Sequence, residues 1–303
     1  MLAKRKSHIK LGKSEAFYQT IIHIIVGLVT IFCIFPLIYA IGMSFTTEAE
    51  MMKNNYFVII PTNPTLLAYK SVLTRNNFFS GLGISGLRVL LGVPGALILT
   101  VPAGYILSNK NMPGRGGFMI YFIITMILSG GLIPSYLLMR DLQLLNTFWV
   151  YIIPTLGGAF NILIVKLFVE EIPRDIIESA DIDGASEMTK MTSIAIPLLV
   201  PTLCALGLFA AVMHWNSWFD SMLFVRDPQL RTVQYVIRDL LIATSVTVTN
   251  NSAAGSGMIL MDKVATEGIK MASVVVALIP VLCVYPFLQK YFIYGMYTGS
   301  VKG

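Results

Sequence analysis

The sequence predicts an all-α protein that crosses a membrane several times. Of its 303 residues, 55% are hydrophobic and only 13% are charged, too few polar side chains to cover a soluble globule of this size. Apolar runs of about 20 residues, the length that crosses a hydrocarbon core, recur along the chain. About six of them are predicted as transmembrane helices, at residues 20–45, 80–107, 117–139, 147–169, 194–214 and 271–289.

A cluster of basic residues before the first run orients the chain. Its members are Lys4, Arg5, Lys6, Lys10 and Lys13. Positive charge marks the cytoplasmic side of a membrane protein, so the N-terminus is predicted to be cytoplasmic. Lys110, Arg115, Lys166, Arg174, Lys190 and Lys290 then also fall on the cytoplasmic side. The net charge of +6 is explained in this way and does not indicate nucleic-acid binding.

Several of the spans are predicted to be kinked, because prolines lie inside them. Neighbouring helices can satisfy the carbonyl groups that such prolines leave free. The prolines are Pro36, Pro94, Pro102, Pro134, Pro154 and Pro280. We expect the kinked helices to surround a pathway.

Arg88 is the clearest ionisable residue within a predicted span. Because it lies early in the second span, its side chain is predicted to extend to the outer surface; the alternative is a buried functional charge. Carriers driven by protons or sodium ions tend to contain intramembrane acids, although a charge at a helix centre costs about 2.5–3.5 kcal/mol. No acid lies near the middle of a predicted span. Because the spans lack such acids, a secondary carrier or channel for a small polar solute is kept only as the alternative hypothesis.

A polar segment between the fourth and fifth spans is the most informative part of the chain. It contains Glu178-Ser179-Ala180-Asp181-Ile182-Asp183-Gly184-Ala185 and, further on, Ile194 to Pro197. Pro173 is suited to the first turn of a helix and Gly184 to its end at positive φ, so two short helices joined by a turn are predicted. Asp175, Glu178 and Asp181 recur every three residues and form an acidic strip. This strip faces either water alone, as in an ordinary loop helix, or a partner.

The long segment at 215–270 is predicted to be external. Apolar residues at helical spacing predict a helix over Thr232–Thr244. The following residues, Thr247–Gly257, are rich in Thr, Asn, Ser and Gly and predict a loop. The segment is either a flap over the helices or a docking surface for an external solute-binding protein.

The residue pattern predicts neither catalysis nor a metal site. The cysteines (Cys33, Cys204, Cys283) and the histidines (His8, His23, His214) lie singly along the chain. Both residue types are therefore assigned structural roles. The sequence also has no Gly-x-x-x-x-Gly-Lys-Ser/Thr phosphate-binding loop. The chain is expected to be non-catalytic, with ATP handled by another polypeptide.

These motifs, in this order, resemble the permease subunits of bacterial ATP-binding cassette (ABC) importers. Segment 170–197 is similar to the EAA loop of that family, in which Glu-x-Ala, Asp-Gly-Ala and a later Ile-x-x-Pro recur. Other stretches resemble the second permease of maltose-type carbohydrate importers, in the branch that imports oligosaccharides and polysaccharide fragments. They are Gly104-Tyr105, Pro113-Gly114-Arg115, Gly130 to Pro134, Arg140-Asp141-Leu142, Leu145-Asn146-Thr147, Trp215-Asn216 and Tyr285 to Phe292. The resemblance implies the type I ABC importer permease fold.

The resemblance also implies that the EAA loop is a pair of coupling helices that docks on an ATPase. The residues implied are Glu178, Ala180, Asp183, Gly184 and Ala185, with Ile194 and Pro197 where the loop enters the fifth span. Ala180 and Ala185 are small enough for close helix approach, and Gly184 permits the reversal. Glu178 offers a carboxylate to a cationic partner, while Asp183 either caps the second helix or joins the contact.

The partners implied by the resemblance are a second permease subunit in a heterodimer, two ATPase subunits, an extracellular solute-binding protein and a carbohydrate. ATP and Mg are expected on the ATPase subunits, with no cofactor in this chain. The location implied is a bacterial plasma membrane, with multiple spans in the lipid bilayer and both termini cytoplasmic. Residues 1–79, 80–292 and 293–303 are predicted as an N-terminal part, the transporter domain and a cytoplasmic tail.

Aromatic rings and amides are the expected lining of a sugar path. The candidates are Asn161, Tyr121, Trp215, Asn216 and Trp218, together with Tyr136, Trp149 and Tyr151. Trp and Tyr also collect at both membrane surfaces, so each aromatic is alternatively an interfacial anchor. Asn161 is the strongest candidate, because it is an amide within a span.

Overall fold

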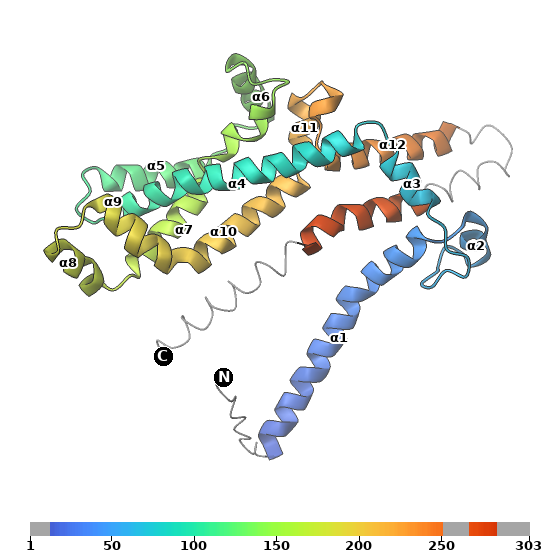
Figure 1. The fold of residues 1–303 in the computed structure, drawn as a ribbon, viewed down its shortest axis with the longest axis horizontal. Helices are drawn as coiled ribbons and strands as arrows, with labels where there is room; N and C mark the ends of the chain where they lie inside the picture. The colour runs from blue at the N-terminus through green and yellow to red at the C-terminus, as the bar shows by residue number, and fades with distance from the viewer. Residues whose placement is uncertain (1–12, 251–266, 284–303) are drawn as a thin grey trace. The chain divides into compact units, whose positions relative to one another are not determined.

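The computed structural model describes residues 13–250 and 267–283, and every regular element within them is a helix (Figure 1). The predicted all-α class is confirmed. The chain divides into two compact units, each with its own packing. Among the described residues, the first unit comprises 13–70, 248–250 and 267–275, and the second comprises 71–247 and 276–283.

The first unit is built on one long apolar helix, α1 (Lys13–Ser44), which is followed by the short helix α2 (Glu48–Lys53). The most apolar 18-residue window of α1 contains no buried residue. The chain after α2 returns to the end of α1, where a Cβ on Gly42 would lie 2.1 Å from the Ile59 carbonyl oxygen. Met43, Met51 and Val58 form a small core there. Helix α3 (Leu67–Leu73) then leads into the second unit.

Three helices form the centre of the second unit: α4 (Phe78–Ser108), α7 (Ala159–Glu170) and α10 (Ile196–Asn216). Two glycines of α4 allow α7 and α10 to approach closely. A Cβ on Gly104 would lie 2.7 Å from Val165 Cβ in α7, and one on Gly92 would lie 2.5 Å from His214 Nε2 in α10. Val165, Leu199 and Leu206 are buried between the three helices.

The third and fourth apolar runs do not form single helices, and the predicted spans 117–139 and 147–169 are wrong in this respect. In the third run, α5 (Arg115–Ile127) and α6 (Leu132–Asp141) meet at 114°. Gly131, in the break, has a φ of +83°, which glycine adopts without a steric penalty. In the fourth run, the 3₁₀ helices η1 (Phe148–Tyr151) and η2 (Ile153–Thr155) meet α7 at 43°. The glycine pair 157–158 lies in that break.

Five of the six predicted spans correspond to helices or bent pairs that can cross a membrane. In the part of the chain that the structure describes, three helices are long and apolar enough: Phe17–Ser44, Phe78–Ser108 and Glu187–Asn216. The two bent pairs raise the total there to five. The sixth predicted span, 271–289, is helical from 267 to 283, and its remainder lies outside the described residues. The helix predicted over 232–244 is present as α12 (Val233–Asn250), and its external location stays a prediction. Because α12 continues to Asn250, the loop predicted from Thr247 does not begin there; residues 251–257 lie outside the described residues.

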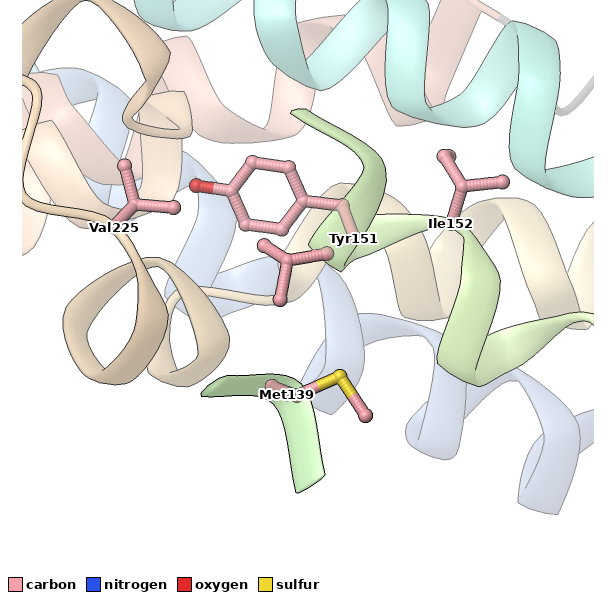
Figure 2. Close-up of a cluster of buried hydrophobic side chains, with 5 residues drawn as sticks. Met139, Tyr151, Ile152 and Val225 are labelled. Atoms are coloured by element: carbon pink, nitrogen blue, oxygen red, sulfur yellow. The ribbon is translucent and has the colours of Figure 1, made fainter. Parts of the chain in front are cut away.

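A second apolar cluster joins α6, η1 and the chain that follows α11 (Phe219–Phe224). Its buried members are Met139, Val150, Tyr151, Ile152 and Val225. Figure 2 shows the Tyr151 ring in the middle of this cluster, with Met139, Ile152 and Val225 on different sides of it. The unit also contains α8 (Arg174–Ile182), α9 (Glu187–Thr189), the π-helix η3 (Lys190–Ala195) and the 3₁₀ helix η4 (Pro228–Leu230). In Figure 1, α8 and α9 lie near one end of α4, and α11 lies nearer the other.

Candidate coupling site

The helix and turn predicted in the polar segment are present in the structure. Pro173 precedes the first residue of α8, and Gly184 follows its last turn at a φ of +72°. The Gly184 N–H donates to the Asp181 carbonyl oxygen at 3.1 Å, and the Ala185 N–H donates to the Ala180 carbonyl oxygen at 2.9 Å. These two bonds form a Schellman motif, which ends a helix and satisfies two of its free carbonyl groups. The glycine is required because its left-handed conformation is costly for other residues.

The second helix begins with a serine cap, which corrects one of the two roles predicted for Asp183. Ser186 is the residue before α9, and its Oγ accepts a hydrogen bond from the Thr189 N–H at 3.2 Å. Asp183 instead follows the last residue of α8 and does not cap α9. A serine at this position is a strong cap because its oxygen satisfies an N–H that the first helical turn leaves free.

The second helix of the loop continues directly into α10. From Glu187 to Asn216 the chain forms one helical rod long and apolar enough to cross a membrane. A π-helical turn, η3, lies immediately before Pro197 in this rod, and Ile194 belongs to that turn. Proline has no N–H to donate to the preceding turn, and a π turn is one way in which a helix accommodates such an interruption. The second helix of the loop is therefore continuous with α10.

A buried lysine fastens the two helices of the loop to each other. Lys190 is only 5% exposed, and its Nζ lies 2.5 Å from Asp181 Oδ1 and also binds Glu187 Oε1. The Tyr105 hydroxyl, from α4, donates to Glu187 Oε2 at 2.9 Å. We call Lys190, Asp181, Glu187 and Tyr105 the Lys190 cluster. From the sequence, Lys190 was predicted only to lie on the cytoplasmic side. The Glu187–Lys190 spacing of three is the signal that could have identified the pair.

The end of the unit that carries the loop also gathers charges predicted to be cytoplasmic. Arg115 Nε donates to the Leu107 carbonyl oxygen of α4 at 2.8 Å, and its Nη2 lies 2.7 Å from Glu170 of α7. Glu170 also pairs with Lys166 at 2.8 Å. Glu170 and Lys190 line one groove, so these charges lie at the same end of the unit. The side of the membrane that this end faces stays a prediction.

A groove of about 1000 Å³ lies between α8–α9 and the chain that joins α4 to α5. Exposed Glu178 lines it, together with Asp181, Glu187 and Lys190. Ala180 is buried and Ala185 is half-buried, so the small residues face the protein, whereas Asp183 and Gly184 are exposed.

Two apolar side chains that were not predicted as site residues project from the loop. Ile182 is 87% exposed, and Met188 is 65% exposed. They lie on either side of the Gly184 turn, at the end of α8 and in α9. These two side chains are the most exposed apolar groups at the turn and are therefore candidates for contact with a partner.

Arg88 is buried, and the prediction that it extends to the outer surface is wrong. Its guanidinium is paired with Asp220 of α11, and its Nε donates to His214 Nδ1 of α10 at 3.0 Å. The sequence indicated that His214 is isolated, but in the structure it accepts this hydrogen bond from Arg88. The sequence placed Arg88 early in α4, but the contacts come from residues far along the chain, which only the tertiary fold brings together.

The candidate path residues lie on three segments of the second unit. Tyr121 is exposed on α5, and Asn161 is half-buried near the start of α7. Trp215 is buried, and its indole N–H donates to the Ala277 carbonyl oxygen at 3.1 Å. Asn216 is exposed, while Trp218 lies beneath the Arg238 guanidinium, 3.2 Å from Cζ to the ring centroid. Their contact with a sugar stays a prediction.

Comparison with known proteins places this architecture among transport components. Residues 96–296 match the family described as "Binding-protein-dependent transport system inner membrane component". Protein LplC of Bacillus subtilis is 39% identical over 279 residues, which cover 92% of this chain and 91% of that protein. The polygalacturonan/rhamnogalacturonan transport system permease protein YtcP of Bacillus subtilis is 36% identical over 271 residues, 89% of this chain and 93% of that protein. A chain in the crystal structure of a bacterial ABC transporter that imports the acidic polysaccharide alginate is 28% identical, with a TM-score of 0.77, and covers 93% of this chain and 99% of that chain.

Proposed function

The chain belongs to the family of binding-protein-dependent transport system inner membrane components, and we propose that it is a permease subunit of an ATP-driven oligosaccharide importer, coupled to its ATPase through α8 and α9. The family makes it a membrane-embedded component of a transport system, and its fold is that of an ABC importer permease. The observation that carries the coupling proposal is the α8–α9 turn, which projects from the unit yet is continuous with α10.

The geometry of the loop is suited to transmit a displacement. A rod of 30 residues, from Glu187 to Asn216, is about 45 Å long at 1.5 Å per residue. Lys190 joins α8 to the start of this rod, and Tyr105 joins the same point to α4. A partner that moves α8 would therefore also move α10, because α9, η3 and α10 follow one another without an intervening loop.

The chemistry of the surface is suited to a protein partner. Ile182 and Met188 offer exposed apolar area, and Glu178 offers an exposed carboxylate beside them. Interfaces combine such an apolar centre with charged groups at the rim. We assign the ATPase to this surface, with Glu178 directed at a cationic side chain of that partner.

Carbohydrate is proposed as the substrate because the relatives point to it. One is named for polygalacturonan and rhamnogalacturonan transport, and the structural neighbour imports the acidic polysaccharide alginate. Asn161, Tyr121, Asn216 and Trp218 are retained as candidate sugar contacts. The proposed assembly contains a second permease subunit, two ATPase subunits that bind ATP and Mg, and an external binding protein.

The proposal is tested by co-expressing the chain with a second permease and an importer ATPase from the same organism and purifying the complex through this chain. We expect both proteins to co-purify, and we expect Gly184→Val to remove the ATPase but not the second permease. The residue at 184 has a φ of +72°, so a β-branched side chain there is strained. Gly157→Val is the matched control, because Gly157 has open space around it, like Gly184, but no positive φ.

Two results would contradict the proposal. If the ATPase stays bound to the Gly184→Val chain, the loop is not the coupling site. If the wild-type chain purifies alone and still transports solute, it is a secondary carrier or channel instead.

A further inference from the structure

Arg88 joins four segments that are far apart in the sequence. Its guanidinium pairs with Asp220 of α11, its Nε donates to His214 of α10 at 3.0 Å, and its Cζ lies 4.8 Å from the centroid of the Tyr151 ring in η1. The Tyr151 hydroxyl donates to the Leu230 carbonyl oxygen at 2.9 Å. We call Arg88, Tyr151, His214 and Asp220 the Arg88 cluster.

Burying the charges of the Arg88 cluster costs desolvation free energy. The Arg88 side chain is 2% exposed and that of Asp220 is 20% exposed, so both charges are largely removed from water. Arg88 Nη1 and His214 Nε2 are buried and have no hydrogen-bond partner within the described residues. Apolar side chains of similar volume would often stabilise such a site equally well or better. A cluster of this kind is therefore better explained by a requirement for one particular arrangement of helices.

The Arg88 cluster lies where α10 ends and α11 begins, so it fixes the turn between these two helices. His214 lies in the last turn of α10, and Asp220 lies in the first turn of α11. Between them is the short turn that carries Asn216 and Trp218. Asp220 Oδ1 accepts hydrogen bonds from Ser217 Oγ at 2.7 Å and from the N–H of the next residue at 2.9 Å. The carboxylate that binds Arg88 therefore also organises the turn.

The Arg88 cluster and the Lys190 cluster lie on the same helical rod. Lys190 is near the start of the segment Glu187–Asn216, and His214 is near its end. Each cluster fastens the rod to α4, through Tyr105 at one position and Arg88 at the other.

We propose that Arg88 is a positioning residue that latches the far end of α10 to α4 and α11, so that the turn at 217–220 moves as one body with the rod. The proposal rests on the proposed function, because that function supplies the force on α8. According to this proposal, a displacement of α8 is transmitted to the turn at 217–220, because the end of α10 cannot bend independently of α4 and α11.

Spin labels on α4 and α11 test the latch. We would replace Leu90 and Met222, which are 70% and 47% exposed, by cysteine and remove the three native cysteines. The distance between the labels is measured in the purified permease pair, and again with the ATPase bound and trapped with Mg-ATP and vanadate. With Arg88 present, we expect one narrow distance distribution in both states.

The decisive variant is Arg88→Met/Asp220→Leu, which replaces both charges by apolar side chains. We expect the distribution to broaden without nucleotide and to shift on trapping, while the ATP hydrolysis rate of the bound ATPase is unchanged. Arg75→Met/Asp239→Leu is the matched control. Arg75 Nη2 lies 3.2 Å from Asp239 Oδ2, and this ion pair is in the same unit but is exposed to water. We expect it to behave as the wild type.

The outcomes separate the latch from the proposed function. A distribution in the double variant that stays narrow and unshifted overturns the latch, whatever the ATPase does. A broadened distribution in a permease pair to which no ATPase binds supports the fastening and overturns the proposed function. If the control variant Arg75→Met/Asp239→Leu broadens the distribution as much as the double variant does, the broadening shows only a general loss of packing, which also overturns the latch.

Discussion

Two buried cations, Lys190 and Arg88, hold opposite ends of the same rod, but their partners differ in exposure. The acids that bind Lys190, Asp181 and Glu187, have side chains that are 53% and 67% exposed. Arg88 binds Asp220, which is 20% exposed, and the buried residues His214 and Tyr151. The ion pairs of Lys190 are therefore in contact with water, whereas the ion pair of Arg88 lies inside the protein.

The difference in exposure determines what each cluster contributes to stability. An ion pair whose partners remain in water contributes about 0–1 kcal/mol to folding. Removing one member of a buried pair costs about 3–5 kcal/mol, because the other charge is left without compensation. We therefore expect changes at the Arg88 cluster to affect stability strongly, and changes at the Lys190 cluster to affect communication with the ATPase.

The largest effect is expected from Asp220→Asn. The substitution keeps the shape of the side chain but leaves the Arg88 charge buried and unpaired, so the free energy of unfolding should fall by about 3–5 kcal/mol. Unfolding of the purified chain in mixed micelles by increasing sodium dodecyl sulfate measures it. Arg88→Met/Asp220→Leu should be destabilised less than Asp220→Asn, because no unpaired charge remains and only the hydrogen bonds from Ser217 and Ser221 to the carboxylate are lost. An Asp220→Asn chain as stable as wild type would show that the pair is not effectively buried.

Gly92→Ala tests the packing of the Arg88 cluster rather than its charge. A Cβ at Gly92 would lie 2.5 Å from His214 Nε2, so the histidine must move and the free energy of unfolding should fall by about 1–3 kcal/mol. Gly86→Ala on the same helix is the matched control, because a Cβ there meets nothing within 4 Å. That control should stabilise α4 by about 0.5–1 kcal/mol, since alanine is the better helix former. Equal effects of the two substitutions would contradict the close packing of His214 on α4.

The contrast between the clusters also shows how far the sequence alone could go. The α8 helix, its end at Gly184 and the first, second and fifth spans depend on local rules, and they were predicted correctly. The break at Gly131 was missed, because the apolar run continues through it and hydropathy does not detect a bend. Arg88 was misplaced because its partners lie 126 residues away at His214 and further on at Asp220. Contacts of that separation have no periodic pattern, so only the tertiary structure reveals them.

At the Lys190 cluster, Lys190→Met should have a small effect on stability and a large one on coupling. The free energy of unfolding should change by no more than about 1 kcal/mol, because both acids regain water. With α8 no longer tied to the rod, ATP hydrolysis by the complex should continue without solute transport. Tyr105→Phe removes only the hydrogen bond to Glu187 and should give a partial loss of transport. A Lys190→Met chain that unfolds far more readily than wild type would mean that this pair is as buried as the one at Arg88.

Ile182→Ser should have the smallest effect on stability, because the side chain is 87% exposed and contributes little to the fold. Its free energy of unfolding should stay within about 0.5 kcal/mol of wild type. If Ile182 is central to the ATPase contact, the affinity for the ATPase should nevertheless fall about tenfold, which corresponds to about 1.4 kcal/mol. Ile133→Ser is the control, since that isoleucine is 70% exposed but lies on α6, away from the loop. Titration of the purified ATPase against each permease in nanodiscs measures the affinity, and an equal loss in both variants would show that the apolar tip of α8 has no special role.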